Sequence, residues 1–472
     1  MSYRDPCGLK SMKPRSTWAL ALASVASLMI ALDLLVVATA LSTIRTDLGA
    51  SIEDLQWTVT GYSLSFAALL MTGGALGDRF GRRRMFVVGL ALFVAASAAC
   101  ALSGTIAALV AARVVQGAGA ALVIPVALAL VSAAYPAEER GKAIGILEGV
   151  TGLATIAGPV VGGAVAGGIA WEAIFWINVP IGLGAIALSL TRLEESRGED
   201  VALDLRGMVL ATGGALCLVW ALVRGNTEGW GSPEVVVCVL LGAGLVAAFI
   251  AWEHRARTPM LPMSFFHSRT FSSATAASFL MFATLYGGVF FITQLMQVGL
   301  GHGPLEAGLL LVPWTATLLV VAPAAGALGD KLGERPVVVA GLVVQAVGLV
   351  SLALLAEPDL AYWKLALALV CTGVGASAVI PVVQSALIGS VSEADIGKAS
   401  GANNFSQELG GAFGVAALVA VFSAVGAYAS AEAFIDGFIP AIAAGAGISL
   451  LGAAVALGLP SRGQGLRVSA RV

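Results

Sequence analysis

The sequence is poor in charged residues. Asp, Glu, Lys and Arg make up 11% of its 472 residues, whereas 58% are hydrophobic, and the mean hydropathy is +0.93. Because ordinary soluble domains carry about 25% charged residues, this composition excludes a typical water-soluble protein. The formal net charge of −2 gives no indication of a nucleic-acid partner, and we predict none.

Residues that build metal, disulfide or cofactor sites are also scarce. The five cysteines are far apart without a Cys-x-x-Cys pair, and the three histidines have no metal-ligand spacing. No phosphate-binding Gly-x-x-x-x-Gly-Lys-Ser/Thr motif occurs, because the Gly-Lys pairs at 141–142 and 397–398 are followed by alanine. We therefore predict no disulfide, metal site or cofactor, no use of ATP, and no enzymatic activity.

Long apolar runs fill most of the chain. A bilayer core of about 30 Å needs roughly 20 apolar residues per helix, and backbone polar groups in lipid must be satisfied within each segment. The first run is too long for a signal-peptide core and reads as a retained helix. The fold class predicted is an all-α polytopic membrane protein with fourteen transmembrane helices. The runs are 18–41, 54–76, 85–104, 106–134, 142–168, 173–191, 207–223, 234–252, 271–299, 306–328, 336–356, 361–388, 399–428 and 438–459.

The distribution of basic residues predicts the orientation. With a cytoplasmic N-terminus, 22 of the 26 Lys and Arg residues fall in the tails and loops on the cytoplasmic side. The outside loops hold only Arg45, Arg224 and Lys364, and Arg113 lies within a run. Since basic residues are retained on the cytoplasmic side, both termini should face the cytoplasm of a bacterial inner membrane.

The chain contains an internal repeat. GGALGDRFGRRRMFVVG at 73–89 returns as AGALGDKLGERPVVVAG at 325–341, and GAGAALVIP at 117–125 returns as GVGASAVIP at 373–381. Parallel repeats around a midplane cavity are typical of transporters whose halves rock against each other. The organisation predicted is a cytoplasmic tail 1–16, a six-helix bundle 17–192, loops with two inserted helices 193–270, a second six-helix bundle 271–460, and a cytoplasmic tail 461–472.

Several segments resemble those of a known family. The loop motif at 73–84, the fourth-run motif ARVVQGAGAA at 112–121, the fifth-run segment 145–163, WEAIFWINVPIG at 171–182 and PLEAGLLLVPW at 304–314 are similar to the major facilitator superfamily. Within it, the chain resembles the fourteen-span drug:proton antiporters of the EmrB/QacA type. The resemblance implies the major facilitator fold, two six-helix halves plus two inserted helices, and transport by alternating access.

The loop motif predicts a conformational latch. Asp78 would accept hydrogen bonds from a neighbouring helix N-terminus or a basic side chain in one conformation and lose them in the other. The alternative is that its arginines only anchor the loop on the cytoplasmic side. The residues assigned to the latch are Gly77, Asp78, Arg79, Gly81 and Arg82, with Asp330 and Arg335 as the weaker copy in the second half.

The fifth apolar run carries a surface of small residues. Glycines allow membrane helices to approach closely, and Pro159 removes one helical hydrogen bond and permits a bend. The family resemblance implies that this surface seals the interface between the halves. Its residues are Gly158, Pro159, Gly162 and Gly163.

Ionisable residues inside the runs mark candidate functional sites, because a charge at the centre of a membrane helix costs about 2.5–3.5 kcal/mol on insertion scales. Asp33 and Arg113 lie at similar depth and can form a pair that protonation of the acid would break. A static structural ion pair is the alternative. Glu148 lies near mid-membrane, where burial favours the protonated acid. We assign proton coupling to Asp33, Arg113 and Glu148, and expect neutralisation of Asp33 or Glu148 to abolish efflux with folding intact.

Polar residues in the runs are candidates for substrate contact. Since Arg113 and Glu148 correspond by the repeat to Leu369 and Asn404, the first half should couple protons and the second should mainly bind substrate. The substrate-binding candidates are Glu148, Gln116, Asn403, Asn404, Gln407 and Glu408.

These features together predict a proton-coupled multidrug or antibiotic efflux transporter. Its partners would be an amphipathic or cationic small molecule, protons and the lipid bilayer, and we expect a monomer. The alternatives are an exporter of one native metabolite or antibiotic, an importer, or a non-transporting membrane sensor with the same fold. The short loops leave no room for a soluble enzyme domain.

Overall fold

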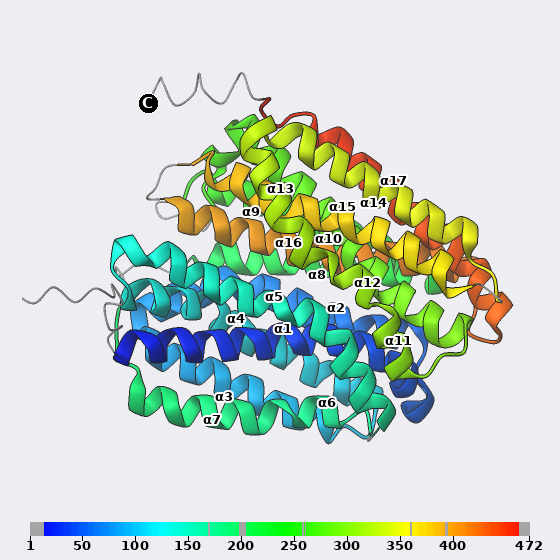
Figure 1. Ribbon diagram of the computed structural model, residues 1–472, viewed down its shortest axis with the longest axis horizontal. Coiled ribbons are helices and arrows are strands. Elements are labelled where there is room, and N and C mark those ends of the chain that lie inside the picture. The colour runs from blue at the N-terminus through cyan, green and yellow to red at the C-terminus, as the bar shows by residue number, and fades with distance from the viewer. Residues whose placement is uncertain are drawn as a thin grey trace, which may run out of the picture.

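The chain is helical throughout the part that the structure describes. This computed structural model describes residues 14–168, 170–197, 204–256, 259, 261–358, 361–391 and 395–461, and within these ranges it contains no strand (Figure 1). The first half comprises α1 (Pro14–Leu48), α2 (Ile52–Phe80), α3 (Arg82–Ala101), α4 (Ile106–Ala134), α5 (Ala137–Gly168), α6 (Ala173–Trp176) and α7 (Asn178–Arg192). The inserted pair is α8 (Leu205–Glu228) and α9 (Pro233–Glu253).

The second half begins with the short helix η1 (Met263–His267). It continues with α10 (Arg269–Gln294), η2 (Leu295–Gly299), α11 (Pro304–Leu310), α12 (Val312–Thr315), α13 (Thr317–Leu332), α14 (Glu334–Leu355), α15 (Tyr362–Ile388), α16 (Ile396–Ser423) and α17 (Ala431–Ala456). The beginning of α1 and the end of α17 lie toward the same end of the bundle (Figure 1). We call this the terminal end, and the other the far end.

The helix boundaries follow signals in the sequence. Ser51 caps α2 in a reciprocal capping box with Asp54, and Ser268 and Ser430 cap α10 and α17. Gly81 and Gly333 occupy equivalent positions of the repeat and have φ angles of +109° and +91°. Only glycine adopts this backbone easily, so each repeat makes the same sharp turn at the terminal end.

Most, but not all, of the expected helices are long and apolar enough to span a membrane. Within the described residues, twelve helices are long and apolar enough to cross a bilayer, or thirteen if the two parts of α2, bent by 49°, form one span. In α5, only Ala143–Ala154 is counted, as a shorter apolar helix. The predicted count of fourteen is therefore not reached by length and composition.

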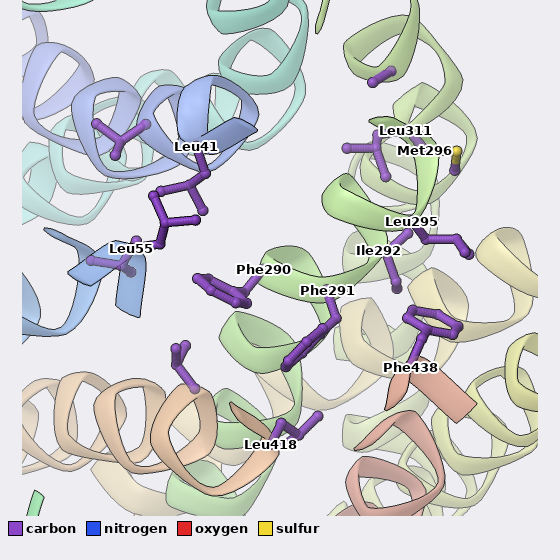
Figure 2. Packing of buried hydrophobic residues seen from close by; sticks show 14 of the residues in the cluster. Leu41, Leu55, Phe290, Phe291, Ile292, Leu295, Met296, Leu311, Leu418 and Phe438 are labelled. Atoms are coloured by element: carbon purple, nitrogen blue, oxygen red, sulfur yellow. The ribbon is translucent and has the colours of Figure 1, made fainter. Parts of the chain in front are cut away.

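At the far end, one apolar cluster joins the two halves. Leu41 and Leu55 of the first half belong to the same buried cluster as Phe290, Phe291 and Leu418 of the second (Figure 2). All these side chains are at most 1% exposed. Burial of this apolar surface holds the halves together at the far end.

At the terminal end, the apolar clusters are separate. One contains only residues of the first half, with Phe86, Phe93 and Val131 among them. The other contains residues of the second half and of the inserted pair, with Phe271 and Val382 at its centre. Among the described residues, the two halves therefore share an apolar cluster at the far end and have separate clusters at the terminal end.

The inserted pair packs across the seam between the halves. Ala215 and Val219 of α8 form a small apolar cluster with Leu64 of α2 and Ala412 and Ala416 of α16. Toward the far end, the Trp220 ring of α8 lies 5.5 Å from that of Trp57 on α2. Helix α8 therefore contacts both halves, which the sequence repeat did not predict.

Candidate coupling site

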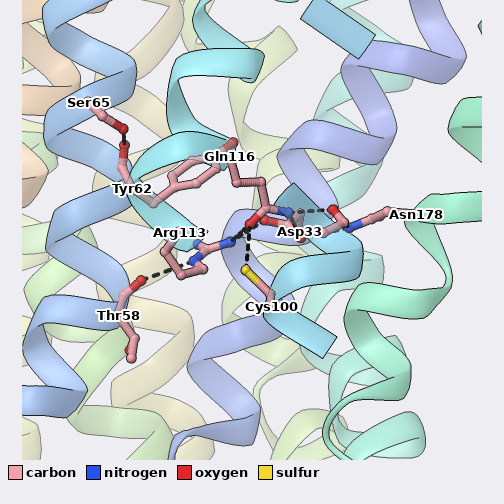
Figure 3. A network of polar contacts seen from close by, with 9 residues as sticks. Asp33, Thr58, Tyr62, Ser65, Cys100, Arg113, Gln116 and Asn178 are labelled. Carbon is pink, nitrogen blue, oxygen red and sulfur yellow. Dashed lines mark hydrogen bonds and ion pairs between the residues drawn. The ribbon is translucent and has the colours of Figure 1, made fainter. Parts of the chain in front are cut away.

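A buried ion pair lies in the first half. One guanidinium nitrogen of Arg113 on α4, Nη1, donates a 2.5 Å hydrogen bond to Oδ2 of Asp33 on α1 (Figure 3). Arg113 is 0% exposed and Asp33 is 4% exposed. The pairing expected from their similar depth is therefore present. A charge-assisted bond in such a dry environment is strong, and breaking it leaves a buried charge without a partner.

Two amide side chains complete the coordination of Asp33. Its other oxygen, Oδ1, accepts hydrogen bonds from Gln116 Nε2 at 2.8 Å and from Asn178 Nδ2 at 2.7 Å (Figure 3). The Ser97 hydroxyl accepts from the same two amides, at 2.7 Å and 3.3 Å. Asp33 is thus bound as a carboxylate by donors from α4 and from the start of α7.

The role predicted for Gln116 changes in this arrangement. Its amide nitrogen is engaged by Asp33 and Ser97, while its oxygen accepts from Arg113 Nη1 at 2.7 Å. Because the side chain is 0% exposed, it has no free group for a substrate. Gln116 positions the ion pair, and its prediction as a substrate contact does not fit the structure. Asn178 was missed, although it lies in the segment WEAIFWINVPIG that the sequence analysis singled out.

The remaining contacts of Arg113 hold its guanidinium in place. Nε donates to the Thr58 carbonyl of α2 at 3.0 Å, and the guanidinium carbon lies 4.3 Å from the centre of the Tyr62 ring. Nη2 has no hydrogen-bond partner among the described residues. The ring face supplies a cation–π interaction in its place. Arg113 therefore ties α1, α2 and α4 together, and its link to α1 depends on the charge of Asp33.

Replacing Asn178 by alanine is expected to lower efflux about tenfold. A hydrogen bond to a charged group contributes about 1.5–3 kcal/mol, so the variant holds Asp33 less firmly against α7. The rate of efflux tests this, with Ser189→Ala as control because Ser189 is a buried hydroxyl on the same helix. An unchanged rate would show that Asn178 has only a packing role.

Glu148 lies on α5, but its side chain lies outside the described residues, as does that of Pro159. The glycines of the α5 motif are described. A β-carbon on Gly162 would lie 2.2 Å from Thr39 Oγ1 of α1, and one on Gly158 would lie 2.7 Å from Leu35 Cβ. A β-carbon on Gly163 would lie 2.2 Å from the Pro304 carbonyl oxygen of α11. Gly163 is therefore the member of the motif that meets the other half.

Polar contacts also join the halves at the far end. Gln297 of η2 donates to the Thr39 carbonyl at 2.7 Å and accepts from the Ser42 hydroxyl. Arg45 lies 4.6 Å from the centre of the Tyr428 ring. Burial raises the pKa of the Tyr428 hydroxyl, so the ring stays neutral beneath this cation. These residues, together with Gly163, close the far end.

The polar residues of α16 do not converge on one site. Asn403 donates to Gln384 on α15 at 2.7 Å, and Gln407 donates to the Ser278 hydroxyl on α10 at 3.3 Å. Both contacts stay inside the second half, and substrate contact by Asn403, Asn404, Gln407 and Glu408 stays a prediction. Asn404 is half-buried.

Glu408 is the member of this group nearest the seam. It is 8% exposed, and one of its oxygens accepts from the Tyr286 hydroxyl of α10 at 3.2 Å. Its other oxygen, Oε2, is buried without a hydrogen-bond partner among the described residues, as is the Ser63 hydroxyl on α2 of the other half. Ser63 is adjacent to Tyr62, whose ring packs on Arg113. Glu408 is therefore the acid that lies between the coupling site and the second half.

The latch loop is anchored inside the first half. Asp78 pairs with Arg82 of the same loop at 2.7 Å, and Arg82 also donates to the Ala129 carbonyl of α4 at 3.4 Å. Glu195, just after α7, accepts from the backbone N–H of Arg83 at 3.0 Å. A β-carbon on Gly81 would lie 2.7 Å from the Glu195 carboxylate, which explains glycine there.

The other latch residues are placed as follows. Gly77 packs closely on Val126 of α4, and Arg79 lies over the Phe80 ring. In the second half, Arg335 donates to the Leu459 carbonyl at 2.7 Å, whereas the side chain of Asp330 lies outside the described residues. Arg335 corresponds by the repeat to Arg83, and each donates to a carbonyl just after the last helix of its half, Leu459 and Leu193 respectively.

Replacing Asp78 by asparagine is expected to lower the efflux rate about tenfold while the amount of protein in the membrane stays unchanged. A latch would switch partners during transport, and the variant loses the ion pair with Arg82 that holds the loop in this conformation. Rates of efflux and membrane content, measured together, test this. Glu228→Gln is the matched control, since it breaks the i,i+4 pair with Arg224 at the far end. Equal rates in Asp78→Asn and wild type would contradict a latch.

Comparison with known proteins gives a consistent result. The family model described as Major Facilitator Superfamily matches residues 23–415. The tetracenomycin C resistance and export protein of Streptomyces glaucescens is 37% identical over 397 residues, which cover 84% of this chain and 74% of that protein. The methylenomycin A resistance protein of Bacillus subtilis is 32% identical over 394 residues, covering 82% and 84%. The multidrug resistance protein Stp of Mycobacterium tuberculosis is 35% identical over 398 residues, covering 84% and 74%.

Solved structures show the same fold at low sequence identity. The POT family transporter PepTSo superposes with a TM-score of 0.69 at 13% identity, covering 96% of this chain and 98% of that one. A bacterial homolog of the human lysosomal transporter Spinster, in an inward-facing and unoccupied conformation, gives 0.66 at 17% identity, covering 95% and 97%.

Proposed function

Because this chain belongs to the Major Facilitator Superfamily, we propose that it is a fourteen-pass exporter that expels amphipathic or cationic small molecules in exchange for protons. The relatives named for antibiotic resistance and export support export as the direction of transport. The two passes beyond the twelve candidate spans would be the bent α2 and the charged α5. Within the first half α2 packs on α4 and α5 packs on α1, in agreement with two six-helix bundles around an inserted pair.

The buried Asp33–Arg113 pair supports proton coupling. Protonation of Asp33 would remove the charge that Arg113, Gln116 and Asn178 bind, and so weaken the link between α1 and α4. Helix α1 also carries Thr39 and Ser42, which bind Gln297 at the far end. The charge of Asp33 and the closure of the far end are thus coupled through one helix.

The packing of the halves supports alternating access. If the basic residues keep the terminal end in the cytoplasm, the cluster shared by the halves closes the outside, and the conformation is inward-facing. In this state Asp33 would release its proton to the cytoplasm and the site would take up substrate. Export would be driven by about 2.3 kcal/mol per charge for each 100 mV, plus the pH gradient.

Efflux from a bacterium that lacks its own drug pumps tests this function. Cells that express the chain should accumulate less ethidium, and a protonophore should remove the difference. Neither effect should occur with Asp33→Asn. Export that persists after the gradient is collapsed, with ATP still present, would contradict proton coupling.

A second function is favoured by the names of the relatives. Two of them are named for resistance to a single antibiotic, which suggests an exporter of one native compound. A susceptibility panel separates the two functions, since a multidrug pump protects against several unrelated compounds and a dedicated exporter against one.

A further inference from the structure

A cavity of about 560 Å³ lies beside the seam, between the inserted pair and the second half. Its walls come from α8, α9, η1, α10 and α16. These segments place it in the half of the bundle toward the terminal end, because α9 ends there and α10 begins there. Pockets for small molecules have volumes of about 300–1,000 Å³.

The lining of this cavity is aromatic and uncharged. Five phenylalanines contribute to it, and none of the lining residues that the structure describes is Asp, Glu, Lys or Arg. They are Phe249, Phe266, Phe279, Phe405 and Phe413. Phenyl rings stack on planar rings, and an unpaired charge inside this wall would be costly. The lining therefore fits an uncharged, planar aromatic molecule better than a cation.

Within the described part of the chain, the only titratable lining residues are two histidines, His254 and His267. Both are exposed and both lie at the terminal end, next to α9 and η1. They mark the polar mouth of an otherwise apolar cavity. A molecule with one polar edge would keep that edge at the histidines and its rings among the phenylalanines.

Helix α16 connects the cavity to the seam. Phe405 and Leu409 line the cavity, whereas Glu408, between them in sequence, accepts a hydrogen bond from Tyr286, and α16 also packs on α2 of the other half. Ala215 and Leu409 belong both to the cavity wall and to the cluster that joins α8 to α2 and α16. A change in the angle between the halves would therefore change the shape of the cavity.

From this lining and position, we propose that the cavity is a binding site beside the seam for an uncharged polycyclic aromatic molecule. The assignment as a substrate site rests on the proposed export function. A membrane lipid chain is the competing occupant, and it would not need a wall of five phenyl rings or a position against the helix that carries Glu408.

Photolabelling of the purified full-length protein in liposomes tests the binding. The probe is 1-azidopyrene, an uncharged photoreactive arene, and a phospholipid with a diazirine in one acyl chain is the comparison. We expect saturable labelling by azidopyrene on the peptides that carry Phe279 and Phe405, and displacement by excess pyrene. Ala211→Phe and Ala215→Phe, which fill the cavity from α8, should each reduce labelling at least about tenfold.

Ala247→Phe is the matched control, because Ala247 is an exposed residue of α9 outside the cavity. Size-exclusion chromatography shows whether each variant folds. Two cavity-filling variants are used so that the test still holds if one of them does not fold. Saturable labelling by the phospholipid instead of azidopyrene, or equal labelling of both folded filling variants and wild type, would overturn the proposal.

This experiment is independent of the proposed function, since labelling requires neither a gradient nor export. Saturable labelling without gradient-driven efflux in the same liposomes would support the cavity and contradict the export function. Gradient-driven efflux of ethidium with no specific azidopyrene labelling would contradict the cavity alone.

Discussion

Asp33→Asn is expected to lower gradient-driven efflux at least about a hundredfold, equivalent to about 2.7 kcal/mol, while the protein still folds. Asparagine resembles the protonated acid, since its amide oxygen can still accept from Arg113. It cannot gain or lose the proton that the cycle requires. The efflux rate in liposomes with an imposed pH gradient, together with the melting temperature in detergent, measures both effects.

Asp33→Ala separates charge from packing. Alanine leaves the fully buried Arg113 without a carboxylate, and breaking a buried ion pair in this way costs about 3–5 kcal/mol. We therefore expect Asp33→Ala to lower the melting temperature as well as efflux. Asp47→Asn is the matched control, because Asp47 lies near the far end of the same helix and accepts from Trp171 at 2.8 Å. An Asp33→Asn variant with normal coupled efflux would refute proton coupling at this residue.

Gly163→Val is expected to prevent closure of the far end and to reduce efflux by at least about a hundredfold. A β-carbon at this position would lie 2.2 Å from the Pro304 carbonyl oxygen and 2.8 Å from Leu305 Cα. Both atoms belong to the backbone, which cannot turn aside as a side chain can, so α5 and α11 must separate. A transporter that cannot close at one end loses alternating access.

Cysteine labelling measures this opening directly. In a variant whose native cysteines are replaced, Ser42→Cys reports on the far end, because Ser42 contacts Gln297 across the interface. A membrane-impermeant maleimide added outside the cells should label it much faster when Gly163→Val is present. Gly168→Val is the control, as a β-carbon on Gly168 meets no atom within 4 Å. Unchanged labelling and efflux in Gly163→Val would refute the seal.

The sequence was informative wherever a feature depends on neighbouring residues. Most apolar runs fall on observed helices, and 106–134 matched α4 at both ends, whereas 306–328 is divided among α11, α12 and α13. The repeat aligns Gly81 with Gly333, and the structure has equivalent turns at both. The pairing of Asp33 with Arg113 was also within reach, because depth along a helix follows from counting residues.

The sequence was less informative about which side chains share a site. Gln116 and Asn403 are polar residues in apolar runs, and sequence reasoning treated both as substrate contacts. In the structure the Gln116 side chain hydrogen-bonds to Arg113 and Asp33, and Asn403 donates to a residue of α15. Asn178 went unnoticed, because a single amide near the end of a run carries no signal in composition or spacing.

The sequence by itself therefore determined that the chain is helical, membrane-embedded, duplicated and equipped with a few buried charges. Hydropathy, helical period and the repeat can be read from the sequence without knowing which helices contact one another. Only the tertiary structure decided that the halves close at the far end, that α8 crosses their seam, and that Asp33 is held by Gln116 and Asn178. These contacts join residues far apart in sequence, and their formation depends on how whole helices pack rather than on any single segment.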